Sequence, residues 1–144
     1  MKTAKKKMRQ KKPLLTIIVP IKNTDEYSRD AKRLKELLNS LKNQTIGLDN
    51  IEVIVSDLDS SGSYRKKHQT ICESFNVRHI YTKTGQTWNI SRSRNIGIKN
   101  AKSDYVMVTD VDCIFSPSFI ETALKIATSE RIIHCMMHLI ISIG

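Results

Sequence analysis

The sequence predicts an α/β fold with a mostly parallel sheet that is flanked by helices on both faces. Short β-branched runs alternate along the chain with segments whose apolar residues recur at helical spacing, which is typical of βαβ units. The runs are continuously apolar, as expected for strands that are buried on both faces. Polar residues follow directly after three of these runs, at the sheet edge where parallel sheets bind ligands.

The first half of the chain predicts two strands and one helix. Residues 14–19 form a β-branched run that Pro20 ends, which indicates a buried strand. Residues 25–42 predict a helix, because leucines recur at spacings of three and four, and residues 23–25 all offer a capping side chain. A second strand is predicted over residues 51–56, followed by a polar loop.

The second half continues the same rhythm. Gly97 lies inside a predicted helix, where glycine costs about 1 kcal/mol relative to alanine, so we expect close packing against a strand. Trp88 precedes this helix; packing over the sheet is the favoured interpretation, and stacking on a ligand is the alternative. The predicted elements are a helix over 64–75, a strand over 77–81, a helix over 91–101 that begins at Ser91 or Ser93, a buried strand over 105–109, and a helix that opens at Ser116–Pro117 and reaches about residue 129.

Charge is concentrated at the N-terminus. The 144-residue chain has a net charge of +10, and residues 1–12 hold seven basic side chains and no acidic one. We therefore expect a disordered basic tail over 1–13 and one domain over 14–144. The tail is predicted to be solvated, with an anionic membrane surface or RNA as its alternative contacts. The nearly neutral remainder does not indicate a body that binds nucleic acid.

The cysteines indicate the compartment. Cys72, Cys113 and Cys135 form no CxxC pair, and three cysteines do not make a disulfide framework. We expect free thiols in a reducing environment, and hence a cytoplasmic protein that the basic tail places near a membrane surface. No apolar run near the start is long enough to span a bilayer.

Asp110 and Asp112 carry the clearest chemical signal. Alternate residues of an extended segment point the same way, so this Asp-x-Asp pair can place two carboxylates together. Two such oxygen donors suit Mg²⁺ or Mn²⁺, which bridge to substrate phosphates. The alternative is a pair of aspartates that bond to their own turn. The hydrophobic strand that leads into the pair favours the metal.

Four segments in order resemble the nucleotide-sugar-binding half of the family 2 glycosyltransferases. They are LTIIVPIKN (15–23), IEVIVSD (51–57), SRNIGIKNA (93–101) and YVMVTDVD (105–112), and the resemblance covers about residues 14–125. It implies a Rossmann-like GT-A sandwich and transfer of a sugar from a nucleoside-diphosphate sugar, expected to be a UDP-sugar, to a glycan or lipid-linked hydroxyl. It also implies a bound Mn²⁺ or Mg²⁺ that stabilises the leaving diphosphate.

The resemblance also implies a role for individual residues. The first loop would line the nucleotide pocket, the second strand would end on a carboxylate that accepts a hydrogen bond from uracil, and the helix would turn a guanidinium toward the phosphates. The expected nucleotide-binding residues are Pro20, Asn23, Asp57, Asp59, Arg94 and Asp110, and the expected metal ligands are Asp110 and Asp112.

The sequence departs from the family after Asp112. An inverting transferase needs a general base well downstream, and neither Glu121 nor Glu130 lies in a segment like the family's base motif. We therefore expect a domain that is incomplete at its C-terminus, with no assigned catalytic residue and an apolar end over 131–144 that could join a second copy or a partner chain. His134 and His138 offer a weaker metal-pair alternative.

Two other functions stay open at this stage. One is a non-catalytic nucleotide-binding fragment, or an RNA-binding module that uses the basic tail. The other is a phosphatase of the haloacid dehalogenase type, because a hydrophobic strand followed by Asp-x-Asp also occurs there. That family places its motif on the first strand, whereas Asp110 and Asp112 come late in this chain.

Overall fold

A computed structural model of the chain describes residues 11–24 and 29–128. Within these ranges a four-stranded sheet has the order β3-β2-β1-β4, and every neighbouring pair is parallel, which confirms the predicted fold class. The elements are β1 (Leu15–Ile21), α1 (Asp30–Lys42), the 3-10 helix η1 (Leu48–Asn50), β2 (Ile51–Leu58), α2 (Gly62–Ser74), β3 (Arg78–Thr82), α3 (Ile90–Lys99), β4 (Val106–Val108) and α4 (Phe119–Ile126). The predictions for residues 1–10 and 131–144 lie outside the described residues.

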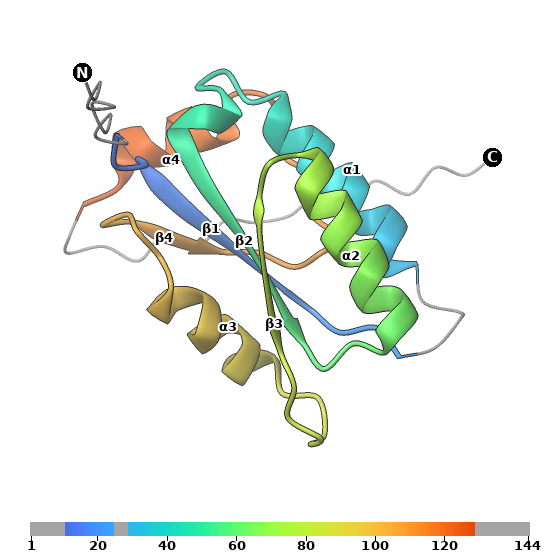
Figure 1. Cartoon of the computed structure of the whole chain (residues 1–144). Coiled ribbons are helices and arrows are strands. Elements are labelled where there is room, and N and C mark those ends of the chain that lie inside the picture. The colour runs from blue at the N-terminus through green and yellow to red at the C-terminus, as the bar shows by residue number, and fades with distance from the viewer. Residues whose placement is uncertain (1–10, 25–28, 129–144) are drawn as a thin grey trace, which may run out of the picture.

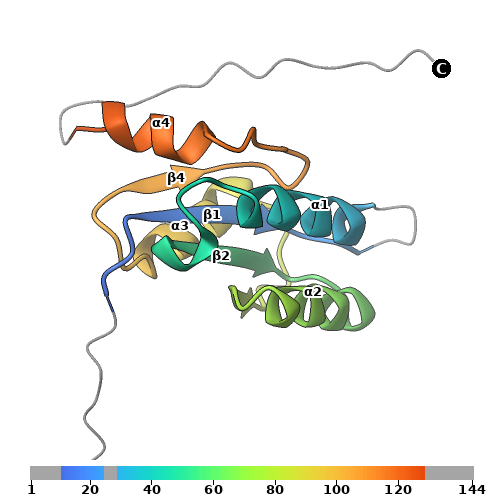
Figure 2. The same ribbon diagram turned by 90° about the horizontal axis from the view of Figure 1, so that it is seen from above.

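Helices cover both faces of the sheet. Helices α1, α2 and α4 lie on one face and α3 lies on the other (Figure 1). Seen from above, α4 runs beside β4 (Figure 2). Alternate residues of β1 and β2, such as Ile17 and Val55, join leucines of α1 in the main core. The intervening residues face α3, as the two-residue period of a strand requires.

Gly97 is the closest contact between α3 and the sheet. A Cβ added at this position would lie 2.4 Å from Cγ2 of Ile18 and 3.1 Å from its Cγ1. Both residues are fully or almost fully buried, and Ile18 belongs to the central strand. The prediction of close packing is confirmed, because only a residue without a side chain lets the helix approach β1 this closely.

Pro20 lies inside β1 and does not end it. The pairing of β1 with β2 runs along the whole strand, whereas the pairing with β4 covers only Thr16 to Ile18. The C=O of Ile18 accepts a hydrogen bond from Thr109, so this residue faces β4. Pro20, two residues further on, faces the same side beyond the end of β4. Its missing N–H therefore costs no ladder hydrogen bond, and the strand continues to Ile21.

Three local predictions differ from the structure. Helix α1 begins at Asp30, later than expected, and its N-cap Arg29 makes no side-chain capping bond. The cap of α3 is Asn89, whose side chain accepts from the N–H of Arg92, rather than Ser91 or Ser93. Strand β4 is a short edge strand whose Val106 and Val108 are exposed, rather than a strand buried on both faces.

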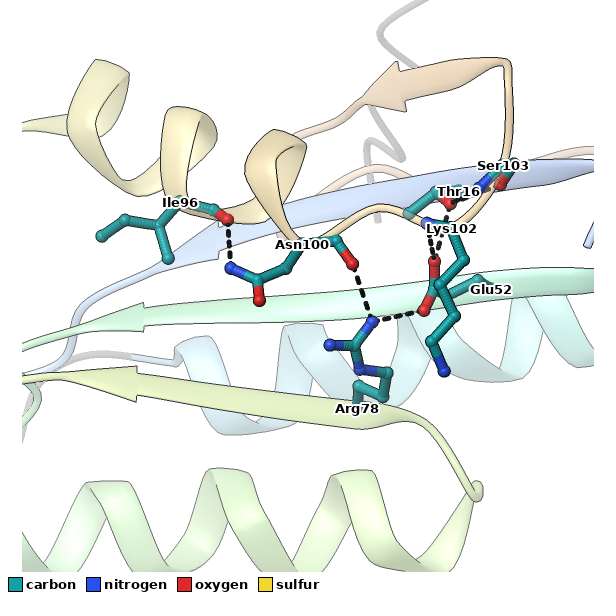
Figure 3. Close-up of polar contacts among 7 residues, drawn as sticks. All are labelled: Thr16, Glu52, Arg78, Ile96, Asn100, Lys102 and Ser103. Atoms are coloured by element: carbon teal, nitrogen blue, oxygen red, sulfur yellow. Dashed lines mark hydrogen bonds and ion pairs between the residues drawn. The ribbon is translucent and has the colours of Figure 1, made fainter.

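A buried carboxylate ties together the amino ends of the strands. Glu52 on β2 accepts hydrogen bonds from the Thr16 hydroxyl, the Lys102 N–H and the Arg78 guanidinium (Figure 3). Burial alone would raise the pKa of Glu52, but these hydrogen bonds outweigh it and lower the pKa below its usual range. Arg78 also donates to the C=O of Asn100, so one side chain links β3 to the end of α3. This network lies at the opposite end of the strands from Asp110 and Asp112.

Candidate functional site

The site forms where the strand order reverses. The chain passes from β1 outward to β2 and β3, and then returns to the other side of β1 with β4. In sheets of this kind, ligands bind outside the carboxyl ends of the strands at this switch point. The segments that follow β1 and β4 carry Asn23 and the pair Asp110 and Asp112, so the fold brings these predicted residues to one edge of the sheet.

An arginine of α3 reaches the acidic pair. Arg94 Nη2 donates to Oδ1 of Asp110 at 3.0 Å, and both side chains are partly exposed. The Nε of Arg94 is buried and has no hydrogen-bond partner. Arg94 and Asp110 therefore lie together at this edge, and the guanidinium keeps a donor that is not used within the described residues.

Asp110 and Asp112 fit the donor set of a hard cation. Both lie in the turn that follows β4 and both are exposed. The bond from Arg94 involves only one oxygen of Asp110, and carboxylate oxygens are what Mg²⁺ and Mn²⁺ prefer. These residues fit the predicted ion. The diphosphate of a bound nucleotide would complete the coordination shell of that ion.

Asn23 is held at the end of β1 by the loop that follows β2. Its N–H donates to the Ser60 hydroxyl at 2.9 Å, and its C=O accepts from the N–H of Ser61. The side chain is 1% exposed, and neither its amide nitrogen nor its amide oxygen has a hydrogen-bond partner. Buried polar atoms are almost always paired. An unpaired amide at this position is therefore the feature to explain.

Asp59 links two loops at the same edge. It has a positive φ of 67°, and its Oδ2 accepts from the N–H of Gly85 at 2.7 Å. That hydrogen bond is the main reason why the pKa of Asp59 lies below its usual range. Lys22 Nζ donates to the C=O of Gln86 at 3.5 Å, so the loop between β3 and α3 is held from two sides. Trp88 in this loop is 39% exposed, which does not support the favoured prediction that it packs over the sheet.

Asp57 lies at the end of β2 with its carboxylate turned into the protein. Its side chain is completely buried and faces α2. Oδ2 accepts from His68 Nδ1 at 2.9 Å and from His79 Nε2 at 3.0 Å, and Oδ1 accepts from the N–H of Ser60 at 3.2 Å. Burial alone would raise the pKa of Asp57, but the hydrogen bonds from the two histidines and Ser60 hold it well below its usual range. In this arrangement the carboxylate bonds to His68, His79 and Ser60, and its contact with a nucleobase stays a prediction.

Sequence reasoning did not single out His68, His79 or Ser60. His68 lies on the buried face of α2, one turn before the buried Cys72, and a histidine at a core position of an amphipathic helix is a signal that can be read. The role of His79 is harder to predict from the sequence, because a single histidine in a short strand does not reveal which face of the sheet it occupies. The three ligand atoms of Asp57, His68 and His79 all lie within 4.8 Å of one another.

Two further predictions concern the surroundings of the site. Cys72 and Cys113 are both buried. Pro20 is buried within β1, beside Ser56 of β2 in the strand register.

Within residues 11–24 and 29–128, no helix combines the length and apolarity that crossing a membrane requires.

The fold and the residues at its switch point define an α/β ligand-binding domain. The model of the family described as "Glycosyl transferase family 2" matches residues 16–141, and the chain belongs to this family. A relative from Haemophilus influenzae, described as an uncharacterized glycosyltransferase, is 34% identical over 128 residues, which cover 87% of this chain and 38% of the relative. The minor teichoic acid biosynthesis protein GgaB of Bacillus subtilis is 32% identical over 114 residues, or 76% of this chain and 11% of GgaB.

Solved structures agree on the fold. Staphylococcus aureus TarS matches with a TM-score of 0.62 at 24% identity, over 78% of this chain and 19% of TarS. A TarS fragment, residues 1–349, has been solved in complex with UDP-GlcNAc and matches 78% of this chain and 30% of its own length with a TM-score of 0.61 at 22% identity. The mannosyltransferase PcManGT of Pyrobaculum calidifontis, solved with GDP-Man and Mn²⁺, matches 73% of this chain and 29% of its own length with a TM-score of 0.57 at 22% identity. The chain thus spans well under half the length of these relatives.

Proposed function

We propose that this chain is the donor-binding part of a metal-dependent glycosyltransferase that takes a UDP-sugar and serves a glycan or other hydroxyl acceptor. The observation that carries the proposal is the contact between Arg94 and Asp110 at the switch point, with Asp112 two residues further on. This arrangement puts a cation and two carboxylates where a diphosphate and its metal ion would meet. Family membership and the UDP-GlcNAc complex of the TarS fragment support the same donor class.

The charges of Arg94, Asp110 and Asp112 indicate how this part of the site would bind a diphosphate. Mn²⁺ or Mg²⁺ held by Asp112 and Asp110 would neutralise the diphosphate as it leaves the sugar. Arg94 keeps Asp110 oriented, and its partly exposed guanidinium supplies positive charge for an anionic oxygen. The acceptor hydroxyl would attack the anomeric carbon on the side opposite the diphosphate. The base that accepts its proton is not assigned among the described residues.

The base half of the site follows from the unpaired amide of Asn23. An amide presents one donor group and one acceptor atom, and the edge of uracil presents an N–H beside a carbonyl oxygen. Pairing the two would satisfy both atoms that now lack partners, and because both atoms are buried it requires the residues that cover Asn23 to move aside on binding. Asp57 then serves the base indirectly, because it holds Ser60, whose hydroxyl accepts from the N–H of Asn23. Asp59 and Pro20 shape the adjacent loop and strand.

The test is calorimetric titration of UDP into the full chain with Mn²⁺, and again with EDTA. We expect binding that requires the metal and that Asp112→Asn weakens at least tenfold. The matched control is Asp104→Asn, an exposed aspartate at the other end of β4, which should leave binding unchanged. Equal binding with EDTA, or equal loss in both variants, would contradict the proposal. Salt-dependent binding of RNA in place of UDP would favour the RNA-binding alternative.

A further inference from the structure

A second group of metal-ligating side chains lies away from the acidic pair. Asp57 comes from β2, His68 from α2 and His79 from β3, so three elements direct one atom each to a common point. His68 Nδ1 and His79 Nε2 both approach the same oxygen, Oδ2 of Asp57, at 2.9 and 3.0 Å. None of these side chains belongs to the phosphate half of the proposed donor site.

We propose that Asp57, His68 and His79 form a binding site for a divalent transition-metal ion, with Zn²⁺ as the preferred occupant. Two imidazole nitrogens and one carboxylate oxygen suit Zn²⁺ and disfavour Mg²⁺, which prefers oxygen donors. Around a tetrahedral ion with bonds of about 2.0–2.1 Å, ligand atoms lie about 3.3 Å apart. Two of the three pairs start at 2.9 and 3.0 Å, and the third pair lies within 4.8 Å, so the two rings would have to approach each other on loading.

The buried ring of His68 has one polar contact among the described residues. The side chain is completely buried, and its Nε2 has no hydrogen-bond partner. The ring therefore does not relay a proton between two partners, and Asp57 is its polar contact. Without metal, each imidazole N–H occupies one lone pair of Oδ2. To bind an ion as a neutral imidazole, each ring must carry its proton on its other nitrogen, which in His68 is the buried Nε2.

The structure also offers the ion an access route. A pocket of about 360 Å³ between α2 and β3 has His79 in its lining, together with Cys72, Arg65 and Tyr81. The His79 side chain is 9% exposed, whereas those of Asp57 and His68 are fully buried. An ion would reach the site from the His79 side, and water from the pocket would fill its remaining coordination position. Asp57 is oriented for this by the N–H of Ser60, which occupies its other oxygen.

This site would stabilise the loop that carries Asn23. The N–H of Ser60 donates to Asp57, and the Ser60 hydroxyl accepts from the N–H of Asn23, so a short chain of bonds joins the ion to the end of β1. A bound ion would fix this loop without touching a nucleotide. The proposal does not depend on the donor being a UDP-sugar, since its test uses no nucleotide.

The test is a titration of the metal-stripped full chain with Co²⁺, which absorbs in the visible range with an intensity that reports its coordination. We expect a stoichiometric four- or five-coordinate spectrum that Zn²⁺ abolishes. His79→Gln, at the pocket, should remove this spectrum and weaken Zn²⁺ binding by at least about 10–100-fold, because loss of even an outer-shell partner of a metal ligand costs that much. Circular dichroism checks that the variant is folded. Two controls should keep the spectrum: Asp112→Asn, and the double variant His134→Gln with His138→Gln.

Three outcomes would overturn the proposal. One is a weak six-coordinate spectrum in the parent chain. Another is an unchanged spectrum in His79→Gln, and the third is its loss in the double variant at His134 and His138. Should His79→Gln fail to fold, X-ray absorption of the Zn²⁺-loaded parent chain decides the question. Two imidazoles with oxygen donors are expected in its first shell, and a sulfur-dominated shell would refute the assignment.

Discussion

Replacing Gly97 with alanine tests the packing of α3 on the sheet. The new Cβ would lie 2.4 Å from Cγ2 of Ile18, over 1 Å inside an ordinary carbon–carbon contact of about 3.5–4.0 Å. Overpacking of this kind costs about 1–3 kcal/mol, and the central position of β1 favours the upper end. Alanine regains about 1 kcal/mol of helix propensity. We therefore expect Gly97→Ala to lower the free energy of unfolding by about 2 kcal/mol.

The assay is urea denaturation followed by circular dichroism, with two comparison backgrounds. Ile18→Ala removes both clashing Cγ atoms and leaves only its Cβ, at 3.3 Å, so Gly97→Ala should become nearly neutral in that background. Gly62→Ala is the matched control, because a Cβ there meets no heavy atom within 4 Å, and it should stabilise by about 0.4–1 kcal/mol. A Gly97→Ala variant as stable as Gly62→Ala, or one still destabilised when Ile18 is alanine, would refute the reasoning.

Three further predictions concern hydrogen bonds of the scaffold. Asn89→Ala removes the cap of α3 and should cost about 1 kcal/mol in urea denaturation, whereas Asn89→Ser should cost clearly less. Ser56 and Ser93 each donate to the other's C=O at 2.7 Å, so each serine-to-alanine change should cost about 1–3 kcal/mol, and strictly additive losses would contradict coupling. Glu52 has a lowered pKa, so its contribution is present above about pH 4.5 and is lost as the pH falls. Glu52→Gln should therefore flatten the decline of the urea midpoint between pH 5 and 3, and an unchanged slope would count against this.

Much of the fold can be predicted because its strands are local patterns. The predicted runs at 51–56 and 77–81 correspond to β2 and β3 with small shifts at their ends, since apolar β-branched residues favour a strand wherever they are buried. The start of α1 and the cap of α3 were harder, because several neighbouring polar residues offer equivalent caps and only packing decides among them. The exposure of β4 depends on what covers its outer edge, which is not a local property of Val106 and Val108.

The candidate site divides in the same way. The place of Asp110 and Asp112 could be predicted because they directly follow a strand, and strand ends meet at one sheet edge. The partners of Asp57 could not be predicted. His68 and His79 lie 11 and 22 residues further along the chain and meet Asp57 only through the packing of α2 and the register of β3. Asp57 thus lies at the centre of a buried cluster that local sequence could not reveal.

Pro20 has a consequence for how the domain can vary. A strand next to β1 can add residues at its carboxyl end only if each new pair of residues finds donors and acceptors on its neighbour. Beyond Ile18, β1 offers a ring nitrogen with no hydrogen on the side that faces β4. Insertions or substitutions that favour a longer β4 would therefore gain no hydrogen bond from the nitrogen of Pro20. The chain after β4 can therefore leave the sheet as a loop. Because Pro20 cannot donate a hydrogen bond to a longer β4, it helps to keep the distance between that loop and Asn23 constant.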